Sequence, residues 1–215
     1  MRKRAWDMKY RKSVLYVCFG AVVLLASVLG AQYGKQVKLQ REIAEKIVRF
    51  HVRANSDSEE DQQLKLEVRD AVGALLGERM KTASDRAECE AVIRASMDEV
   101  VETAEHVIAE EGCSYDVTAQ LAAVDFPVKT YGDYTFPAGT YEALELVIGE
   151  GEGHNWWCVM YPNMCFSDSV YEVVDTDAEE SLRKVLTEEE YREVFTEGNY
   201  QVRFRYLSFL NGLTE

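Results

Sequence analysis

The chain has 215 residues, enough for one membrane or signal segment and one domain of ordinary size. Hydrophobic residues make up 47% of it, which is typical of a protein with a packed core. The formal net charge is −14. Residues 1–12 carry a net positive charge, so the net charge of residues 13–215 is more negative than −14. An acidic domain repels nucleic acid, so the composition argues against nucleic acid as a partner.

The stretch from Ser13 to Gln32 is apolar and contains no charged residue. At about 1.5 Å of rise per residue, a helix of this length crosses the roughly 30 Å core of a bilayer. Six basic residues precede it, so the positive-inside rule predicts that residues 1–12 stay in the cytoplasm and that the chain after the segment is exported. Val28-Leu29-Gly30 would also permit cleavage before Ala31, so a transmembrane anchor and a cleaved signal peptide (residues 13–32 in either case) both remain open.

The exported part is predicted as a helical stalk over residues 33–46 and one extracytoplasmic domain over residues 47–215. Residues 47–53 alternate apolar with basic or histidine side chains, which predicts a strand. Ser58 then has the sequence context of a helix cap, and Gly77 can end the helix that follows.

A second helix is predicted from Ser84 to Gly112 as one continuous element. Cys89 and Cys113 lie near its opposite ends. Twenty-four residues of straight helix span about 36 Å, whereas a disulfide needs Cα atoms within about 7 Å. We therefore expect that these two cysteines do not bond to each other, and their pairing is otherwise open.

The remaining sequence predicts an α+β domain. Turn-forming residues fill the segment 125–139, and helices are predicted over residues 178–186 and after Thr187, which has Glu190 at capping-box spacing. Alternating or short apolar runs predict strands over residues 115–121, 140–148, 156–161 and 202–206. The predicted fold class is α+β: an N-terminal membrane or signal helix, then one domain with a mainly antiparallel sheet and packed helices.

Cys158 and Cys165 flank a segment that contains the turn signal Pro162-Asn163. A turn there would bring the two sulfurs together, and export permits disulfides, so a Cys158–Cys165 bond is predicted. The alternative is two small apolar residues in a strand and its return. No CxxC spacing is present, which disfavours a four-cysteine zinc site.

Enzyme motifs such as HExxH, GxSxG and the P-loop do not occur in the sequence. Asp175-Thr176-Asp177 resembles an aspartic-protease motif but lacks its glycine. The glycine-rich segment 149–153 contains two glutamates that would repel a phosphate, so an exposed loop is the better interpretation. We predict no catalytic residue, no cofactor, no metal and no small-molecule substrate.

Two histidines lie in the unusual segments of the chain. His51 and His154, with a carboxylate such as Asp57, could bind zinc if the fold brought them together. The simpler interpretation is hydrogen bonding that fixes two loops, His51 to the turn at residues 55–57 and His154 locally.

Trp156 and Trp157 are the best candidates for an exposed contact, because consecutive strand residues point to opposite faces of a sheet. One ring can fill the core while the other lies beside the glycine loop; packing of both in the core is the alternative. The candidate partner-binding residues are His51, Asn55, Ser56, Asp57, Glu150, Gly151, His154, Asn155, Trp156 and Trp157.

Four segments carry a resemblance to a known family: residues 51–57, 61–72, 136–142 and 149–166. With them, the chain from Ile47 to Phe166 resembles the stage II sporulation protein R family. Asn163 departs from the pattern, where a second proline is expected, and this loosens the predicted turn.

The resemblance implies a signalling protein that is made in the forespore and exported to, or anchored in, the forespore membrane with its domain in the intermembrane space. There it would activate a membrane-bound aspartic protease, which processes the precursor of an early mother-cell sigma factor. The resemblance brings no catalytic residues. A secreted cell-envelope hydrolase centred on His51 or His154, and a packing module of an envelope assembly, remain as alternatives. The surface that contacts the protease and the oligomeric state are open.

Overall fold

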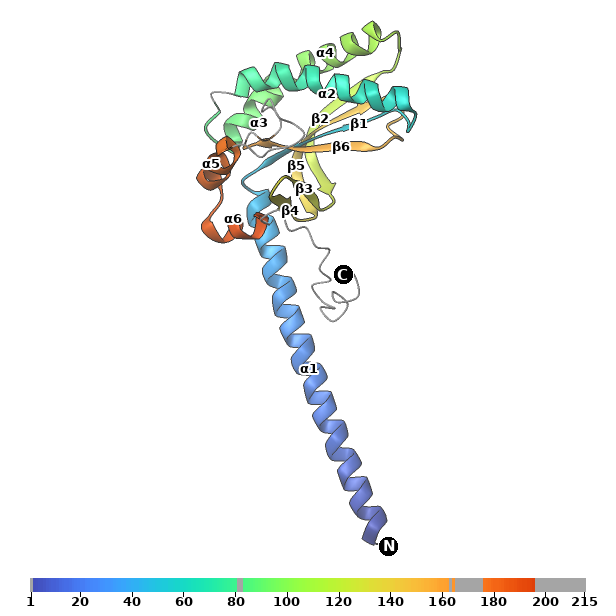
Figure 1. Ribbon diagram of the computed structural model, residues 1–215, viewed down its shortest axis with the longest axis vertical. Coiled ribbons are helices and arrows are strands. Elements are labelled where there is room, and N and C mark those ends of the chain that lie inside the picture. Colours follow the sequence, from blue (N-terminus) through green and yellow to red (C-terminus); the bar gives the residue numbers. More distant parts are fainter. Residues whose placement is uncertain (1, 81–82, 163, 165–175, 196–215) are drawn as a thin grey trace. The chain divides into compact units, whose positions relative to one another are not determined.

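A computed structural model describes residues 2–80, 83–162, 164 and 176–195 (Figure 1). The predicted strand at residues 202–206, Cys165 and Asp175 lie outside this part of the chain.

The first element is a single long helix, α1 (Arg2–Ala44), which contains the apolar run and residues 33–44 of the predicted stalk. Its stretch Val14–Ala44 is long and apolar enough to cross a membrane, with a mean hydropathy of 2.4 in its most apolar window. Large apolar side chains such as Leu15 and Phe19 are exposed along it. Length and composition therefore fit a membrane anchor or a signal segment.

The last turn of α1 belongs to the globular unit, and Ile43 is fully buried there. The unit continues with β1 (Val48–Arg53), α2 (Glu59–Met80), α3 (Arg86–Ala95), α4 (Met97–Glu110), β2 (Val117–Phe126), β3 (Lys129–Tyr131), β4 (Tyr134–Phe136), β5 (Gly139–Ile148), β6 (Asn155–Tyr161), α5 (Thr176–Val185) and α6 (Glu188–Val194).

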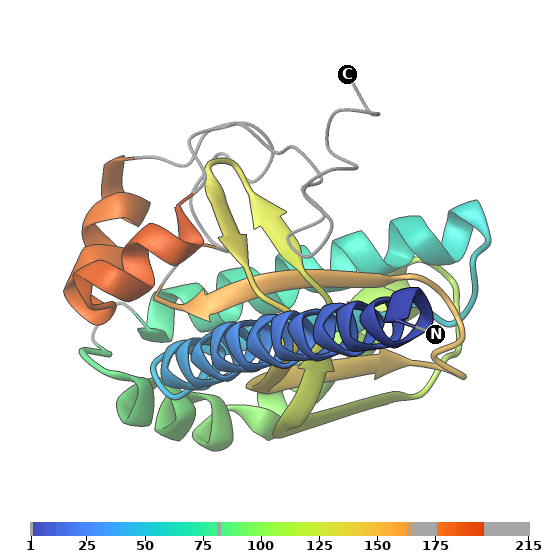
Figure 2. The same cartoon turned by 90° about the horizontal axis from the view of Figure 1, so that it is seen from below.

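Four strands form one sheet in the order β2-β5-β1-β6, and β3 and β4 form a separate hairpin (Figure 1). β1 runs parallel to β5, whereas the β1–β6 and β2–β5 pairs are antiparallel. The predicted α+β class with a mainly antiparallel sheet is confirmed. The hairpin lies within residues 125–139, for which only turns were predicted; Figure 2 shows it, in yellow, as its own two-stranded element.

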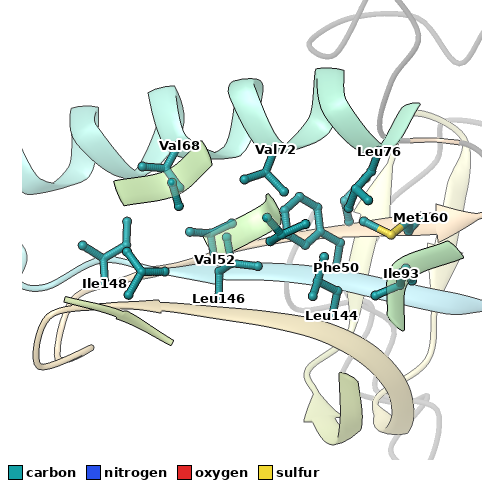
Figure 3. Close-up of a cluster of buried hydrophobic side chains, with 14 of the residues drawn as sticks. Phe50, Val52, Val68, Val72, Leu76, Ile93, Leu144, Leu146, Ile148 and Met160 are labelled. Carbon is teal, nitrogen blue, oxygen red and sulfur yellow. The ribbon is translucent and has the colours of Figure 1, made fainter. Parts of the chain in front are cut away.

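One face of the sheet packs against α2, α3 and α4 and forms the core (Figure 3). β1 contributes Phe50 and Val52, which alternate along the strand as predicted, and α2 contributes Val68 and Val72 at helical spacing. Because each such side chain stabilises the fold by about 1.5–3 kcal/mol when fully buried, this layer is the main source of stability.

The prediction of one continuous helix from residue 84 to residue 112 is wrong. Asp85 caps α3 by accepting a hydrogen bond from the Glu88 backbone N–H, and the chain leaves helical geometry at Ser96 before α4 begins. Ser96 is buried and its hydroxyl accepts a hydrogen bond from Arg79 of α2 at 2.7 Å. The break lets two short helices pack separately on α2, which one straight helix could not do.

Two cysteines and one cap behave as the sequence predicts. Cys89 and Cys113 are both free thiols, so they do not bond to each other, as expected, although the argument from one straight helix does not hold. Thr187 and Glu190 form a reciprocal capping box at the start of α6, as their spacing predicts.

Candidate functional site

The two unusual segments of the sequence interlock at one end of the sheet. The glycine loop after β5 donates two backbone hydrogen bonds to the turn after β1, from Glu152 to the Asn55 carbonyl and from Gly153 to the Ala54 carbonyl, each 3.0 Å long. The Asn55 side chain also accepts from the Glu150 backbone N–H at 3.0 Å. Residues separated by about a hundred positions therefore build one rigid structure, which we call the interlocked loops (residues 54–57 and 149–154).

Close approach of the two backbones explains two of the glycines. A Cβ atom on Gly153 would overlap the backbone carbonyl of Ser56, and one on Gly149 would overlap the side chain of Asn55. Gly149 also has a φ of +56°, which other residues rarely adopt. The glycine-rich sequence is thus a requirement of this contact.

Asp57 and His154 form a pair at the outer end of the interlocked loops. One carboxylate oxygen of Asp57 accepts hydrogen bonds from the His154 ring nitrogen Nδ1 and, at 2.6 Å, from its backbone N–H. The hydrogen bond from the His154 side chain is the largest cause of the lowered pKa of Asp57. Both side chains remain exposed, His154 by 80%. The prediction that His154 is hydrogen-bonded locally is wrong, because its partner Asp57 belongs to the other loop, 97 positions earlier in the chain.

Asp61 ties the turn to the start of α2. Its carboxylate accepts from the Asn55 amide at 2.9 Å and from the Ser56 hydroxyl at 2.5 Å, and its backbone N–H donates to the Ser58 hydroxyl at 3.1 Å. The hydroxyl of Ser56 is the main cause of the lowered pKa of Asp61. The side chains of Asn55 and Ser56 therefore make hydrogen bonds within the fold, and their role as partner contacts stays a prediction.

A row of four side chains crosses the sheet on the face away from the three core helices. The strand registers align Trp157 of β6 with His51 of β1, His51 with Glu145 of β5, and Glu145 with Gln120 of β2. The His51 ring stacks on Trp157 with centroids 4.8 Å apart, and Gln120 donates to Glu145 at 2.7 Å. We call these four residues the polar row.

His51 is fully buried at the centre of the polar row. Burial lowers its pKa to about 4, with Arg53 and Arg49 acting in the same direction and Glu145 opposing them. The ring is therefore neutral at pH 7. Its Nε2 lies 3.3 Å from Glu145, but the contact lacks hydrogen-bond geometry, and among the described residues neither ring nitrogen has a hydrogen-bond partner.

Arg49 lies next to the polar row and is also fully buried. Its guanidinium donates to the Cys158 carbonyl and to the Tyr131 hydroxyl, both at 2.9 Å. Its carbon Cζ lies 4.3 Å from the centre of the Phe126 ring and 5.3 Å from that of Phe136, with Tyr131 and Tyr141 within 6 Å. These aromatic rings and the two hydrogen-bond acceptors offset the cost of burying the Arg49 cation. The same contacts hold the β3–β4 hairpin against the sheet.

A family model described as stage II sporulation protein R (spore_II_R) matches residues 44–171, which include the whole sheet and the interlocked loops. The chain belongs to this family. It is 33% identical to stage II sporulation protein R of Bacillus subtilis (strain 168) over 162 residues, which are 73% of this chain and 72% of that protein. No solved structure matches the chain.

Membership of the stage II sporulation protein R family confirms the resemblance found in the sequence and establishes a role in sporulation. The polar row, Arg49 and both interlocked loops all lie within the matched residues. The α5–α6 segment lies beyond them.

The two tryptophans of the family region point to opposite faces of the sheet, as predicted. Trp156 lies on the core face, edge-on to Phe50 at 5.6 Å between centroids and 5.0 Å from the guanidinium of Arg69. Trp157 lies on the polar face, and the ammonium of Lys129 is 5.6 Å from its ring centre. Both rings are half-buried. Trp157 is therefore the tryptophan placed among polar side chains.

The two histidines belong to separate sites. His51 contacts Glu145 within the sheet, and His154 contacts Asp57 in the loops. The prediction that His51 hydrogen-bonds to the turn at residues 55–57 is wrong, because its ring nitrogens are unpaired. In the described part of the chain no three His, Cys, Asp or Glu side chains are grouped to hold a metal ion.

The sequence did not identify Arg49, Gln120 or Glu145 as candidate site residues. A signal existed for Glu145, because it is an acidic residue within the apolar run at residues 143–148. Arg49 appeared in the sequence as part of an ordinary polar strand face.

Proposed function

We propose that this chain is an extracytoplasmic sporulation signal that activates a membrane-bound aspartic protease, which then processes the precursor of an early mother-cell sigma factor. The observation that carries the proposal is membership of the stage II sporulation protein R family across the whole sheet. The apolar helix α1 supports export toward, or anchoring in, the forespore membrane, with the domain in the intermembrane space.

An activator has to bind the active state of its target more tightly than the inactive state, and it needs no catalytic group to do so. The interlocked loops suit this task. Five hydrogen bonds between distant segments hold them, so little conformational entropy is lost on binding. Glu150, Glu152 and His154 are exposed there and are available for contact. Trp157 lies on the next strand and provides an aromatic anchor.

The direct test is co-expression of the full chain with the protease and the sigma-factor precursor in a host that does not sporulate. Processing that depends on this chain is the expected result. Absence of processing, with all three proteins present and the domain digestible by an external protease in cells with a permeable wall, would refute the proposal.

The tryptophans give a matched pair for the contact surface. Trp157→Ala is expected to cost about 2 kcal/mol or more in binding, because truncated aromatic anchors typically do. Trp156→Ala is expected to act through stability instead, because Trp156 packs on Phe50. A melting curve accompanies each activation assay. Normal activation by a folded Trp157→Ala variant would place the contact elsewhere.

A further inference from the structure

Unpaired buried polar atoms gather on one face of the sheet. In the described ranges, the buried side-chain nitrogen and oxygen atoms without a hydrogen-bond partner are Arg49 Nη1, His51 Nδ1 and Nε2, Arg53 Nε and Asn155 Oδ1. Folded proteins leave few such atoms, and each calls for an explanation such as a ligand. Their concentration at one place is therefore a pointer to a binding site.

These residues form a continuous strip. Positions 49, 51 and 53 are alternate residues of β1 and so share a face, and Asn155 of β6 pairs with Arg53 in the strand register. At about 3.3 Å per residue, the strip is about 13 Å long from position 49 to position 53. Arg49 and His51 are fully buried, so a partner segment contacts the strip at its Arg53–Asn155 end.

The strip is cationic although the protein is acidic. Arg49, Arg53 and Lys129 are positively charged, and the Glu145 carboxylate pairs with Arg53 at 3.3 Å. His51 is neutral, and the whole chain has a formal charge of −14. Burial and the positive charge of Arg49 lower the pKa of Lys129, so an added negative charge would relieve this repulsion.

The strip also reaches the surface. The Arg53 side chain is 37% exposed, Lys129, Asn155 and Trp157 are half-buried, and Gln120 is exposed. Arg53 needs an acceptor and Asn155 Oδ1 needs a donor, and a peptide backbone supplies both. A phosphate dianion supplies acceptors alone and would leave Asn155 Oδ1 without a donor. Polypeptide with acidic side chains therefore fits best.

We propose that this strip binds an extended acidic segment of a protein partner, with a carboxylate at Arg53 and Lys129 and a backbone N–H at Asn155. The inference rests on the proposed function, in which that partner is the membrane protease. It adds Arg53 and Lys129, neither of which lies in the interlocked loops, to the contact surface.

The test measures peptide binding to the strip and does not depend on activation of the protease. The full chain in detergent micelles is titrated with a fluorescent peptide of alternating Glu and Val residues and with a matched peptide of Gln and Val. We expect the acidic peptide to bind at least about tenfold more tightly, since a charge pair at a partly buried site is worth this much. Lys129→Glu and Arg53→Gln are expected to remove the preference. Lys184→Glu, on exposed α5, is expected to retain it.

Arg53→Gln breaks the ion pair with Glu145 and could destabilise the fold, whereas Lys129→Glu leaves that pair intact. The Lys129→Glu result is therefore decisive on its own. Equal affinity for both peptides, or a preference that survives Lys129→Glu, would overturn the inference. Lys129-dependent binding to phosphatidylglycerol vesicles in place of the peptide would also overturn it.

The co-expression assay separates the two proposals. If the unmodified chain triggers processing and Lys129→Glu does so at the same dose, the strip fails and the proposed function stands. If the unmodified chain triggers no processing, the proposed function fails, and the peptide titration alone decides on the strip.

Discussion

The interlocked loops can be tested by adding a single methyl group. In Gly153→Ala, the new Cβ would overlap the backbone carbonyl of Ser56, so the two loops would have to separate. Separation lengthens the hydrogen bonds from Gly153 to Ala54 and from Glu152 to Asn55, each 3.0 Å in the native fold. Each is worth about 0.5–1.5 kcal/mol, and a small-to-large change in a packed site adds strain of about 1–3 kcal/mol.

We therefore expect Gly153→Ala to lower the free energy of unfolding by about 2–4 kcal/mol. The assay is urea denaturation of the full chain in detergent, followed by tryptophan fluorescence. Gly34→Ala is the matched control, because a Cβ at Gly34 meets nothing within 4 Å and alanine favours a helix. If Gly153→Ala unfolds at the same urea concentration as the unmodified protein, the backbones do not approach as described.

Three further predictions concern buried groups. Arg49→Lys is expected to destabilise the fold by about 2–4 kcal/mol, because an ammonium cannot reach both acceptors and loses the stacked rings; Arg94→Lys, 59% exposed, should stay within about 0.5 kcal/mol in the same denaturation assay. Burial holds the folded-state pKa of His51 below its ordinary value of 6.5, so the unfolded chain binds a proton first as the pH falls. The free energy of unfolding should therefore be constant above pH 6.5 and fall by about 3 kcal/mol as the pH drops to 4. Urea midpoints measured against pH should show this loss in the unmodified protein and not in His51→Phe. A Cys158–Cys165 disulfide, expected to contribute about 2–3 kcal/mol by loop entropy, should appear as a linked peptide in mass spectrometry of unreduced protein, and free thiols at both positions would refute it.

The fold class and the strands β1, β5 and β6 could be predicted to within a residue or two, because alternation of apolar side chains and flanking turn residues mark them. The helix break could not. Ser96 is neither glycine nor proline, and it ends α3 because of tertiary contacts that include the hydrogen bond from Arg79. Local propensity carries no information on such a contact.

The candidate site could be predicted only in part. His51, Trp157 and the loop residues were named from the sequence, but the burial of Arg49 and His51 was not foreseen. Alternating basic residues in a strand normally indicate a solvent face. Here Phe126, Tyr131 and Phe136 cover Arg49, and two of these come from a hairpin whose short strands resemble turns in the sequence.

The polar row has a consequence for the point in synthesis at which it can form. Its members come from four strands, at residues 51, 120, 145 and 157, and the row exists only when β5 and β6 have paired with opposite edges of β1. Contacts so distant in sequence form late in folding, since closing long loops is slow. A nascent chain that ends before β6 therefore lacks the complete polar row.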